Sequence, residues 1–167
     1  VEVKLKGDSE INVSVGTDYH ELGVLLYDNK VLVDNPSYKV ISDIDTNVLG
    51  KYEIKYIVKY LGRKYEVKRI VNVIDDIKPV INANVDKIVV DYCTKNYKTE
   101  LEYTAIDNYD KDLTKDVIKE ETEDKIILKV SDSSNNIGVL ELPIEYTNKP
   151  QTTFKLNGNK VVYVSYL

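Results

Sequence analysis

The sequence predicts an all-β protein built from antiparallel β-sandwiches, and three observations carry this prediction. Residues 51–60 alternate between a charged face and an apolar face, which is the period of a half-buried strand. Val, Ile, Tyr and Thr recur along the chain, whereas Met and Trp are absent. Turn clusters such as GTD, YDNK and SDSSNN separate short strand-like runs. Many short strands without a periodic helix are typical of sandwiches.

The clearest element is a long hairpin over residues 51–73, with its turn at Gly62. The apolar face of its first strand consists of Tyr52, Ile54, Tyr56, Val58 and Tyr60. Two interpretations of these tyrosines are open: an exposed aromatic platform for a ligand, or the inside wall of a sandwich. Because the opposite face already carries the charged residues, we expect the tyrosine face to be buried.

Shorter strand-like runs occupy much of the remaining chain. They lie at residues 1–5, 11–15, 22–27, 31–33, 38–41, 88–90, 101–106, 126–130 and 139–146. Residues 111–125 also fit a short helix, because Leu113, Val117 and Ile118 would align on one helical turn. The context of the stretch favours strand.

Internal similarity predicts a tandem organisation. The segments KLKGDSEINVSVG, at 4–16, and KLNGNKVVYVSYL, at 155–167, align without gaps, and residues 75–92 have the same rhythm. We therefore predict two complete units, residues 1–75 and 76–147, followed by the first strands of a truncated third repeat at 148–167. Because unpaired strands tend to add to a sheet edge, we expect this tail to pair with the second unit or a neighbouring chain.

Composition excludes several classes of protein. The chain has 23 Lys and Arg against 28 Asp and Glu, and the two signs are interspersed, so no nucleic-acid partner is expected. No run of 18 apolar residues is present, so we expect no membrane insertion in this segment. The N-terminus lacks the regions of a signal peptide. The chain is therefore expected to be either cytosolic or a piece of a longer exported protein.

The first hairpin and its flanks resemble a known family. TNVLGKYEIKYIVKYLGRKYEVKRIVNVID, at 46–75, is similar to the closing half of bacterial Ig-like domains of unknown function that are related to hyalin-repeat modules. AIDNYDKDLTKDV and VSDSSNN resemble that family's two turns, except that Lys111 and Asn135 stand where the family usually has glycine. The matching positions of the hairpin are Thr46, Gly50, Tyr52, Tyr56, Arg69, Val71, Val73 and Asp75.

This resemblance implies a fold and a setting. It implies two tandem Ig-like sandwiches, on an extracellular or cell-surface protein of a Gram-positive bacterium. Similar strings of domains precede polysaccharide deacetylase domains, so the parent protein is expected to carry a catalytic domain of that kind. For this segment the resemblance implies a non-catalytic spacer or interaction module, with cell-wall polysaccharide or a surface protein as its partner.

Acidic residues form the best candidate metal site. They lie in the link between the units and in turns of the second unit, at Asp75, Asp76, Asp107, Asp110 and Asp132. Calcium takes six to eight oxygen ligands, which a link and adjacent turns could supply together. The alternative is that these residues cap their own backbone in turns. If calcium binds, we expect it near the joint, and we expect no other cofactor.

The remaining candidates concern binding and catalysis. Tyr97 and Tyr109, with Tyr163 and Tyr166 in the tail, are candidates for exposed ligand contacts, which gives a carbohydrate- or peptidoglycan-binding module as the alternative function. Cys93 is the only cysteine, so the chain can form no intrachain disulfide and no thiolate metal site. His20 has no recognisable triad partners, and no HExxH, CxxC or phosphate loop is present. We therefore expect no enzyme activity in this segment.

Overall fold

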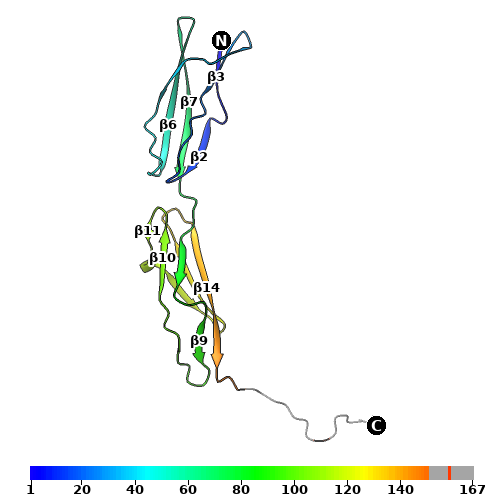
Figure 1. The fold of residues 1–167 in the computed structure, drawn as a ribbon, viewed down its shortest axis with the longest axis vertical. Coiled ribbons are helices and arrows are strands. Elements are labelled where there is room, and N and C mark those ends of the chain that lie inside the picture. The colour runs from blue at the N-terminus through cyan, green and yellow to red at the C-terminus, as the bar shows by residue number, and fades with distance from the viewer. Residues whose placement is uncertain (151–157, 159–167) are drawn as a thin grey trace, which may run out of the picture.

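The computed structural model describes residues 1–150 and Gly158, and this part of the chain is almost entirely β (Figure 1). The predicted all-β, sandwich-like fold class is confirmed for these residues. Residues 151–157 and 159–167 lie outside the described part. The predictions that fall on them are the first strands of a third repeat, the pairing of these strands with another sheet edge, and ligand contacts by Tyr163 and Tyr166.

The N-terminal half of the described chain, residues 1–74, consists of two facing sheets with the orders β1-β3-β4 and β2-β7-β6-β5. Side chains from both sheets form one hydrophobic cluster, which includes Leu26 of one sheet and Ile54 of the other. The strands are β1 (Glu2–Leu5), β2 (Glu10–Ser14), β3 (Val24–Asp28), β4 (Val31–Val33), β5 (Tyr38–Ile41), β6 (Gly50–Tyr60) and β7 (Arg63–Ile74).

The C-terminal half, residues 80–147, again consists of two sheets, with the orders β8-β10-β11 and β9-β14-β13-β12. Its core is a second cluster that contains Ile81, Ala105 and Leu128 and shares no residue with the first. The elements are β8 (Val80–Ala83), β9 (Ile88–Asp91), β10 (Tyr103–Asp107), β11 (Lys111–Asp112), the 3-10 turn η1 (Thr114–Asp116), β12 (Ile118–Glu121), β13 (Lys125–Ser131) and β14 (Ile137–Thr147). Residues 111–125 therefore contain two short strands, the start of a third and one 3-10 turn, rather than a regular helix.

The two halves have the same topology, strand for strand. Strand β1 corresponds to β8, β2 to β9, and so on to β7 and β14. The expectation of purely antiparallel sheets needs a correction, because β2 pairs with β7, and β9 with β14, in parallel. The chain leaves the first sheet after β1 and joins the other sheet as β2, where it runs beside the last strand of the half in the same direction (Figure 1).

The hairpin of β6 and β7 supplies one wall of the first core. Its register pairs Gly50 with Val73 and Tyr60 with Arg63. Tyr56 is completely buried, which confirms the inside-wall interpretation of the tyrosine face. Tyr52 and Tyr60 are half-buried, and their hydroxyls donate to the Val48 carbonyl at 2.9 Å and the Asp28 carboxylate at 3.2 Å. An aromatic ring whose hydroxyl reaches a partner at the rim suits this position.

A buried arginine lies in the same wall. Arg69 is completely buried, and its guanidinium carbon lies 5.7 Å from the centre of the Tyr56 ring. Its Nη2 donates to the Lys6 carbonyl, and its Nη1 lies 3.9 Å from Oε1 of Glu21. The Tyr56 hydroxyl donates to the same Glu21 oxygen at 2.6 Å. Glu21 is thus the anionic partner that the buried guanidinium needs.

Removal of the charge of Glu21 tests this pairing. We expect Glu21→Gln to lower the free energy of unfolding by about 2 kcal/mol, because the buried cation loses its counter-charge while Glu21 itself is partly solvated. Urea unfolding measures the effect. The control is Glu53→Gln, because Glu53 forms ion pairs at the surface, and we expect that change to stay within about 0.5 kcal/mol. Equal losses in the two variants would contradict the pairing.

The link between the halves, residues 75–79, packs closely against the second half. A Cβ added to Gly138 would lie only 2.2 Å from the Pro79 carbonyl oxygen, so glycine is required where β14 passes the link. On the other side of the joint, the Val15 amide donates to the Ile74 carbonyl at 2.8 Å, and Ser14 Oγ donates to Asp76 at 2.7 Å. The link is therefore held from both halves.

We expect Gly138→Ala to destabilise the protein by about 1–3 kcal/mol, because the added methyl group would force the link away from β14. Thermal unfolding followed by circular dichroism measures the loss. Val139→Ala, at an exposed neighbouring position, is the control and should change the stability by less than about 0.5 kcal/mol. A neutral Gly138→Ala would show that the close approach is not needed.

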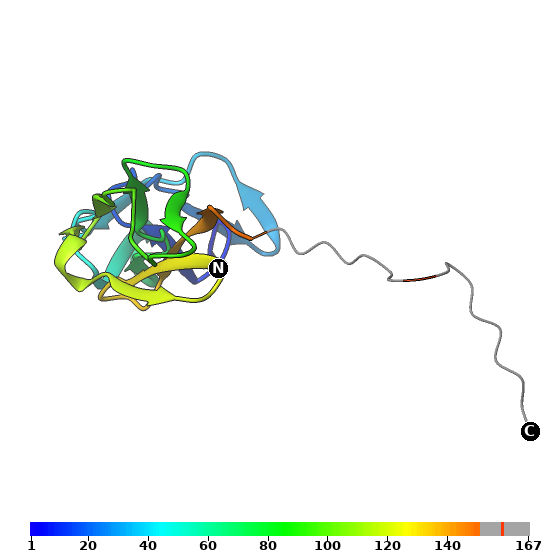
Figure 2. The ribbon, with the colours of Figure 1, turned by 90° about the horizontal axis from the view of Figure 1, so that it is seen from below.

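The two halves lie end to end in an elongated molecule (Figure 1). A view turned by 90° shows them superposed, so both lie along one long axis (Figure 2). The chain enters each half at one end and leaves it at the other, since the N-terminus and Thr147 lie at opposite ends of the described strands. Within the described residues, no helix has the length and apolar character needed to cross a membrane.

Candidate functional site

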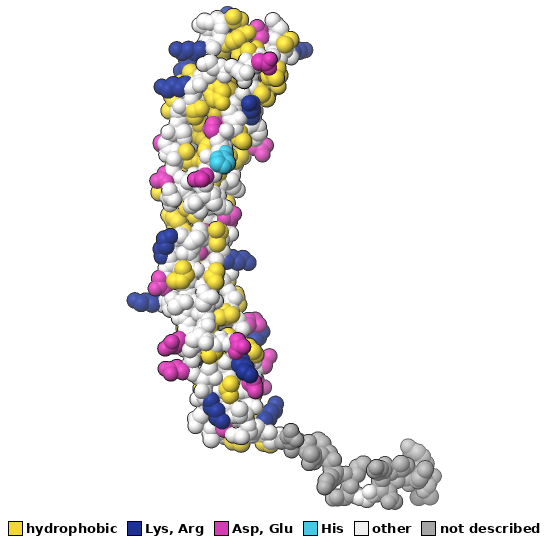
Figure 3. Space-filling view, in the orientation of Figure 1, with side chains coloured by type: hydrophobic (Ala, Val, Ile, Leu, Met, Phe, Trp, Pro, Cys, Tyr) yellow, Lys and Arg dark blue, Asp and Glu magenta, His cyan; other side chains and the backbone are white. Residues whose placement is uncertain are grey.

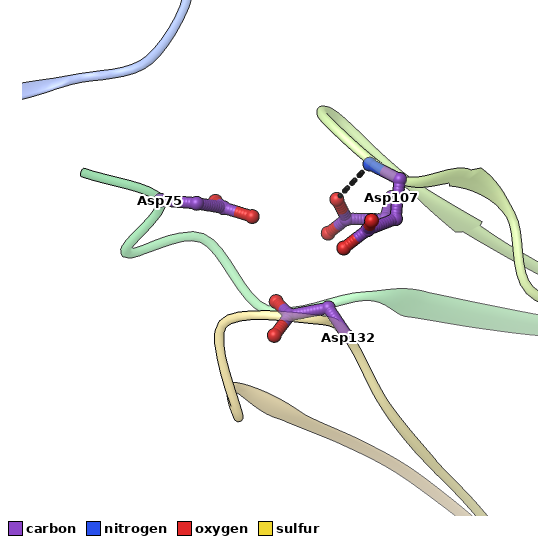
Figure 4. Close-up of side chains that lie close together, drawn as sticks. Asp75, Asp107 and Asp132 are labelled. Atoms are coloured by element: carbon purple, nitrogen blue, oxygen red, sulfur yellow. Dashed lines mark hydrogen bonds between the residues drawn. The ribbon is translucent and has the colours of Figure 1, made fainter. Parts of the chain in front are cut away.

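Four carboxylates converge at the joint, where the C-terminal half faces the link (Figure 4). One oxygen from each of Asp75, Asp107, Asp110 and Asp132 lies within 4.8 Å of the others. Asp75 follows β7 in the link, Asp107 ends β10, Asp110 lies in the turn to β11, and Asp132 follows β13. Asp75, Asp107 and Asp132 are only 8%, 3% and 6% exposed. We call these four residues the joint cluster.

Local turn chemistry explains why the chain places three of these side chains here. One oxygen of each buried aspartate accepts hydrogen bonds from amides two to four residues further along, which is the bonding of an Asx turn. These bonds run from Ile77 to Asp75 at 3.2 Å, from Tyr109 and Asp110 to Asp107 at 2.8 and 2.9 Å, and from Ser134 and Asn136 to Asp132 at 2.9 and 2.7 Å. The turn-capping alternative therefore accounts for Oδ1 of each residue.

The second oxygens are not explained in this way. Oδ2 of Asp75 and Oδ2 of Asp107 are buried and have no hydrogen-bond partner among the described residues. In the part of the chain that the structure describes, the ion pairs include none to the four cluster carboxylates. Buried anionic oxygens that lack both a donor and a counter-charge are costly. The cluster thus has an unmet need for positive charge.

The pKa of Asp75 reflects this environment. Burial raises the pKa, and the negative charges of Asp107, Asp132 and Asp110 raise it further, against the lowering effect of the Ile77 amide. The side chain is therefore held where its ionised form is disfavoured.

A turn aspartate at the other end of the C-terminal half behaves in the opposite way. Asp91 accepts the amides of Cys93 and Thr94, both at 3.0 Å, and the side-chain amide of Asn148 at 2.7 Å. The Thr94 amide, with Asn148 and then Cys93, lowers the pKa of Asp91 to about 2. The pKa values of the two turn aspartates thus shift in opposite directions, because Asp91 is surrounded by donors whereas Asp75 is buried and faces other carboxylates.

Asp91 therefore contributes to acid stability. Its folded pKa lies below the unfolded value of about 4, so its stabilising effect is complete above about pH 4 and is lost as the pH falls towards 2. We expect Asp91→Asn to melt at a lower temperature than the wild type at pH 7, with a gap that closes between pH 4 and pH 2. Melting temperatures at pH 7, 4 and 2 measure this effect. Asp86→Asn, at an exposed position, should follow the wild type, and a gap that stays constant with pH would contradict the assignment.

The structure does not place Asp76 in the joint cluster. Its carboxylate accepts the hydroxyl of Ser14 from the N-terminal half, so neighbouring link residues serve different halves. Two residues that sequence reasoning missed complete the surroundings of the cluster. Asn136 donates to the Asp75 carbonyl at 3.0 Å and to Oδ2 of Asp132 at 2.8 Å, and Ser133 donates to Asp110. The sequence feature that could have identified Ser133 and Asn136 is their position in the turn SDSSNN.

The turns themselves have the backbone that the resemblance implies. Lys111 and Asn135, which replace the glycines usual in that family, have φ values of 68° and 69°. Asparagine tolerates this left-handed region, whereas lysine enters it at a conformational cost.

The candidate contact tyrosines do not come together. Tyr97 is 47% exposed and forms a β-bridge with Val90, at the end of the C-terminal half away from the link. The Tyr97 hydroxyl donates to Glu121, and the amino group of Lys119 lies 5.8 Å from the centre of the Tyr97 ring. Tyr109 is half-buried at the joint, in a shallow cavity that Val15 and Ile77 also line. The two rings therefore lie at opposite ends of the C-terminal half and do not form one platform.

Comparison with known proteins gives one family match, in the N-terminal half. Residues 3–73 match the family model described as bacterial surface protein, Ig-like domain. This half of the chain is thus similar to bacterial surface Ig-like domains. The relation to hyalin-repeat modules and the association with deacetylases stay predictions.

The crystal structure of the lipoprotein BT2262 from Bacteroides thetaiotaomicron aligns with 86% of this chain and 77% of its own at 15% identity, with a TM-score of 0.39. No curated protein matches the sequence.

Proposed function

We propose that this chain is a non-catalytic, extracytoplasmic spacer of a bacterial surface protein, made of two tandem Ig-like modules at residues 1–75 and 76–147. The family match to residues 3–73 supports a surface module. The strand-for-strand topology shared by the two halves supports a second module of the same kind. Separate hydrophobic clusters support two cores in series.

The observation that carries the proposal is the path of the chain. Each half takes in the chain at one end and releases it at the other, so each added module extends the molecule along one axis (Figure 1). A single catalytic or binding domain has no need of this arrangement, whereas a spacer gains reach from it. Charged side chains of both signs are scattered over the visible face, which suits a soluble rod (Figure 3).

What the spacer presents belongs to the parent protein. The resemblance to strings that precede polysaccharide deacetylases favours a catalytic domain of that class, held away from the cell surface or within the cell wall. In this setting the modules act through length and stiffness.

A module exchange tests the spacer role. In the parent protein, we expect replacement of residues 1–75 by an unrelated Ig-like module of equal length to preserve at least half of the surface activity, whereas deletion should reduce it severalfold. The readout is the activity of intact cells, with antibody labelling to confirm display at the surface. Failure of the equal-length replacement, with display intact, would show that specific residues rather than length are needed.

Recognition of cell-wall polysaccharide or peptidoglycan is the second candidate, and the exposure of Tyr97 favours it. Aromatic rings at the surface are common contacts for apolar faces of ligands. Co-sedimentation of the chain with purified cell wall distinguishes the two functions. Retention that falls severalfold in Tyr97→Ala, but not in Tyr109→Ala at the joint, would establish recognition at the far end. Absence of retention would leave the spacer role alone.

A further inference from the structure

We infer that the joint cluster is a calcium site, in which Asp75, Asp107, Asp110 and Asp132 bind one Ca²⁺ and fix the link onto the C-terminal half. This inference rests on the geometry of the joint and does not depend on the proposed spacer function. Three observations support it: unmet ligand oxygens, the number and spacing of the carboxylates, and the restriction of the acids to the joint.

Two buried carboxylate oxygens of the cluster lack a donor within the described residues. Oδ2 of Asp75 and Oδ2 of Asp107 belong to side chains that are more than nine-tenths buried, and neither oxygen has a hydrogen-bond partner. The close-up shows the carboxylates of Asp75, Asp107 and Asp132 directed towards a common space (Figure 4). Turn amides satisfy the Oδ1 atoms of Asp75 and Asp107, so capping leaves the Oδ2 atoms of these two residues free for another ligand.

The atoms that the cluster offers indicate which ion it binds. The cluster offers only carboxylate oxygens, which are the ligands of hard cations, and includes neither His20 nor Cys93. One oxygen from each residue lies within 4.8 Å of the others, which is about twice the Ca–O distance of 2.3–2.6 Å. Mg²⁺ is usually bound through only one or two carboxylates and keeps several waters, so four converging carboxylates favour calcium. Second carboxylate oxygens and water would complete six to eight ligands.

The end of the N-terminal half that corresponds to the joint has a different set of turn residues. Asp28, the last residue of β3, corresponds to Asp107, the last residue of β10. The Asp28 carboxylate accepts a hydrogen bond from the Tyr60 hydroxyl. The turn between β6 and β7 consists of Leu61 and Gly62, whereas the corresponding turn between β13 and β14 contains Asp132. The cluster is thus absent from the equivalent turns in the described N-terminal half. The acids are a property of the joint.

A cation at this place would act on the link. Asp75 comes directly after β7, whereas the other three ligands belong to turns of the C-terminal half. Coordination would therefore tie the end of β7 to the turns after β10 and β13. Together with the Ser14–Asp76 bond, this would hold the link from both sides.

Calcium titration of the chain after treatment with a chelator tests the site. We expect the melting temperature to rise by about 5 °C when free Ca²⁺ is about ten times the dissociation constant, which we expect to lie near the 10⁻⁴–10⁻³ M range of extracellular modules. Isothermal calorimetry should give one ion per chain. No heat and no shift up to about 10 mM would overturn the inference, and an equal shift with Mg²⁺ would overturn the assignment to calcium.

The variants Asp107→Asn and Asp132→Asn locate the ion. The amide keeps the Oδ1 acceptor of each turn but removes a charge, so we expect each variant to fold and to lose most of the calcium-induced shift. Without calcium, Asp107→Asn should melt at or above the temperature of the wild type, whereas Asp132→Asn should melt lower because it loses the acceptor of the Asn136 side-chain amide. Asp91→Asn is the matched control, since Asp91 occupies a buried turn outside the cluster, and it should keep the full shift. A calcium shift retained in both cluster variants would overturn the site.

Amide hydrogen exchange tests the fixing of the link. The Ile77 amide donates to Asp75 at 3.2 Å, so bound calcium should slow its exchange severalfold relative to the calcium-free protein. The Lys98 amide, which donates to the Val89 carbonyl in the same half, is the internal reference for local stability. An Ile77 rate that does not change, although calcium binds, would overturn the effect on the link.

Discussion

Repulsion among the carboxylates at the joint is the constraint to which the surrounding structure responds. Two unit charges about 5 Å apart repel by roughly 3 kcal/mol at an effective dielectric constant of about 20, and the cluster contains four carboxylates within 4.8 Å. Turn amides, Asn136 and Ser133 offset part of this repulsion. Close packing of Pro79 on Gly138 then keeps the link from moving the Asp75 carboxylate out into water. The joint is therefore assembled against an electrostatic cost that its own hydrogen bonds reduce but do not remove.

Strand β7 connects this joint to the core of the N-terminal half. Arg69 lies in its middle, buried between Tyr56 and Glu21, and Asp75 follows directly after its end. The buried guanidinium has a carboxylate within reach, whereas the buried carboxylate has no cation. Because β6 and β7 are paired over their whole length, the position of Asp75 is set by the same register that places Arg69 in the core. The two buried charges are thus held by one paired strand, and within residues 1–150 only the first has a counter-charge.

The sequence predicted the elements better than it predicted their contacts. The period-two alternation of residues 51–60 was sufficient for the hairpin and its buried face, because lysines marked the wet side. Arg69 is in phase with Val67 and Val71, so the alternation places its side chain on the inner face. A charged residue is not expected there, and its burial becomes understandable only from the spatially close Glu21. The same limit applies to Asp75 and Asp76, which are adjacent in the sequence but face different halves. Parallel pairing of β2 with β7 depends on a sheet switch near Gly7, which no local pattern shows.

An acidic end has a physical advantage over an apolar end at such a joint. Modules that met through a large apolar patch would expose it whenever the link opened, and exposed apolar patches promote association between chains. Carboxylates keep the end of the C-terminal half hydrated when the link opens. A cavity at the joint lies beside Val15, Ile77 and Tyr109. The hold of the link on the C-terminal half therefore depends in part on the charge state of a few buried oxygens, which the proposed divalent cation would change at constant pH.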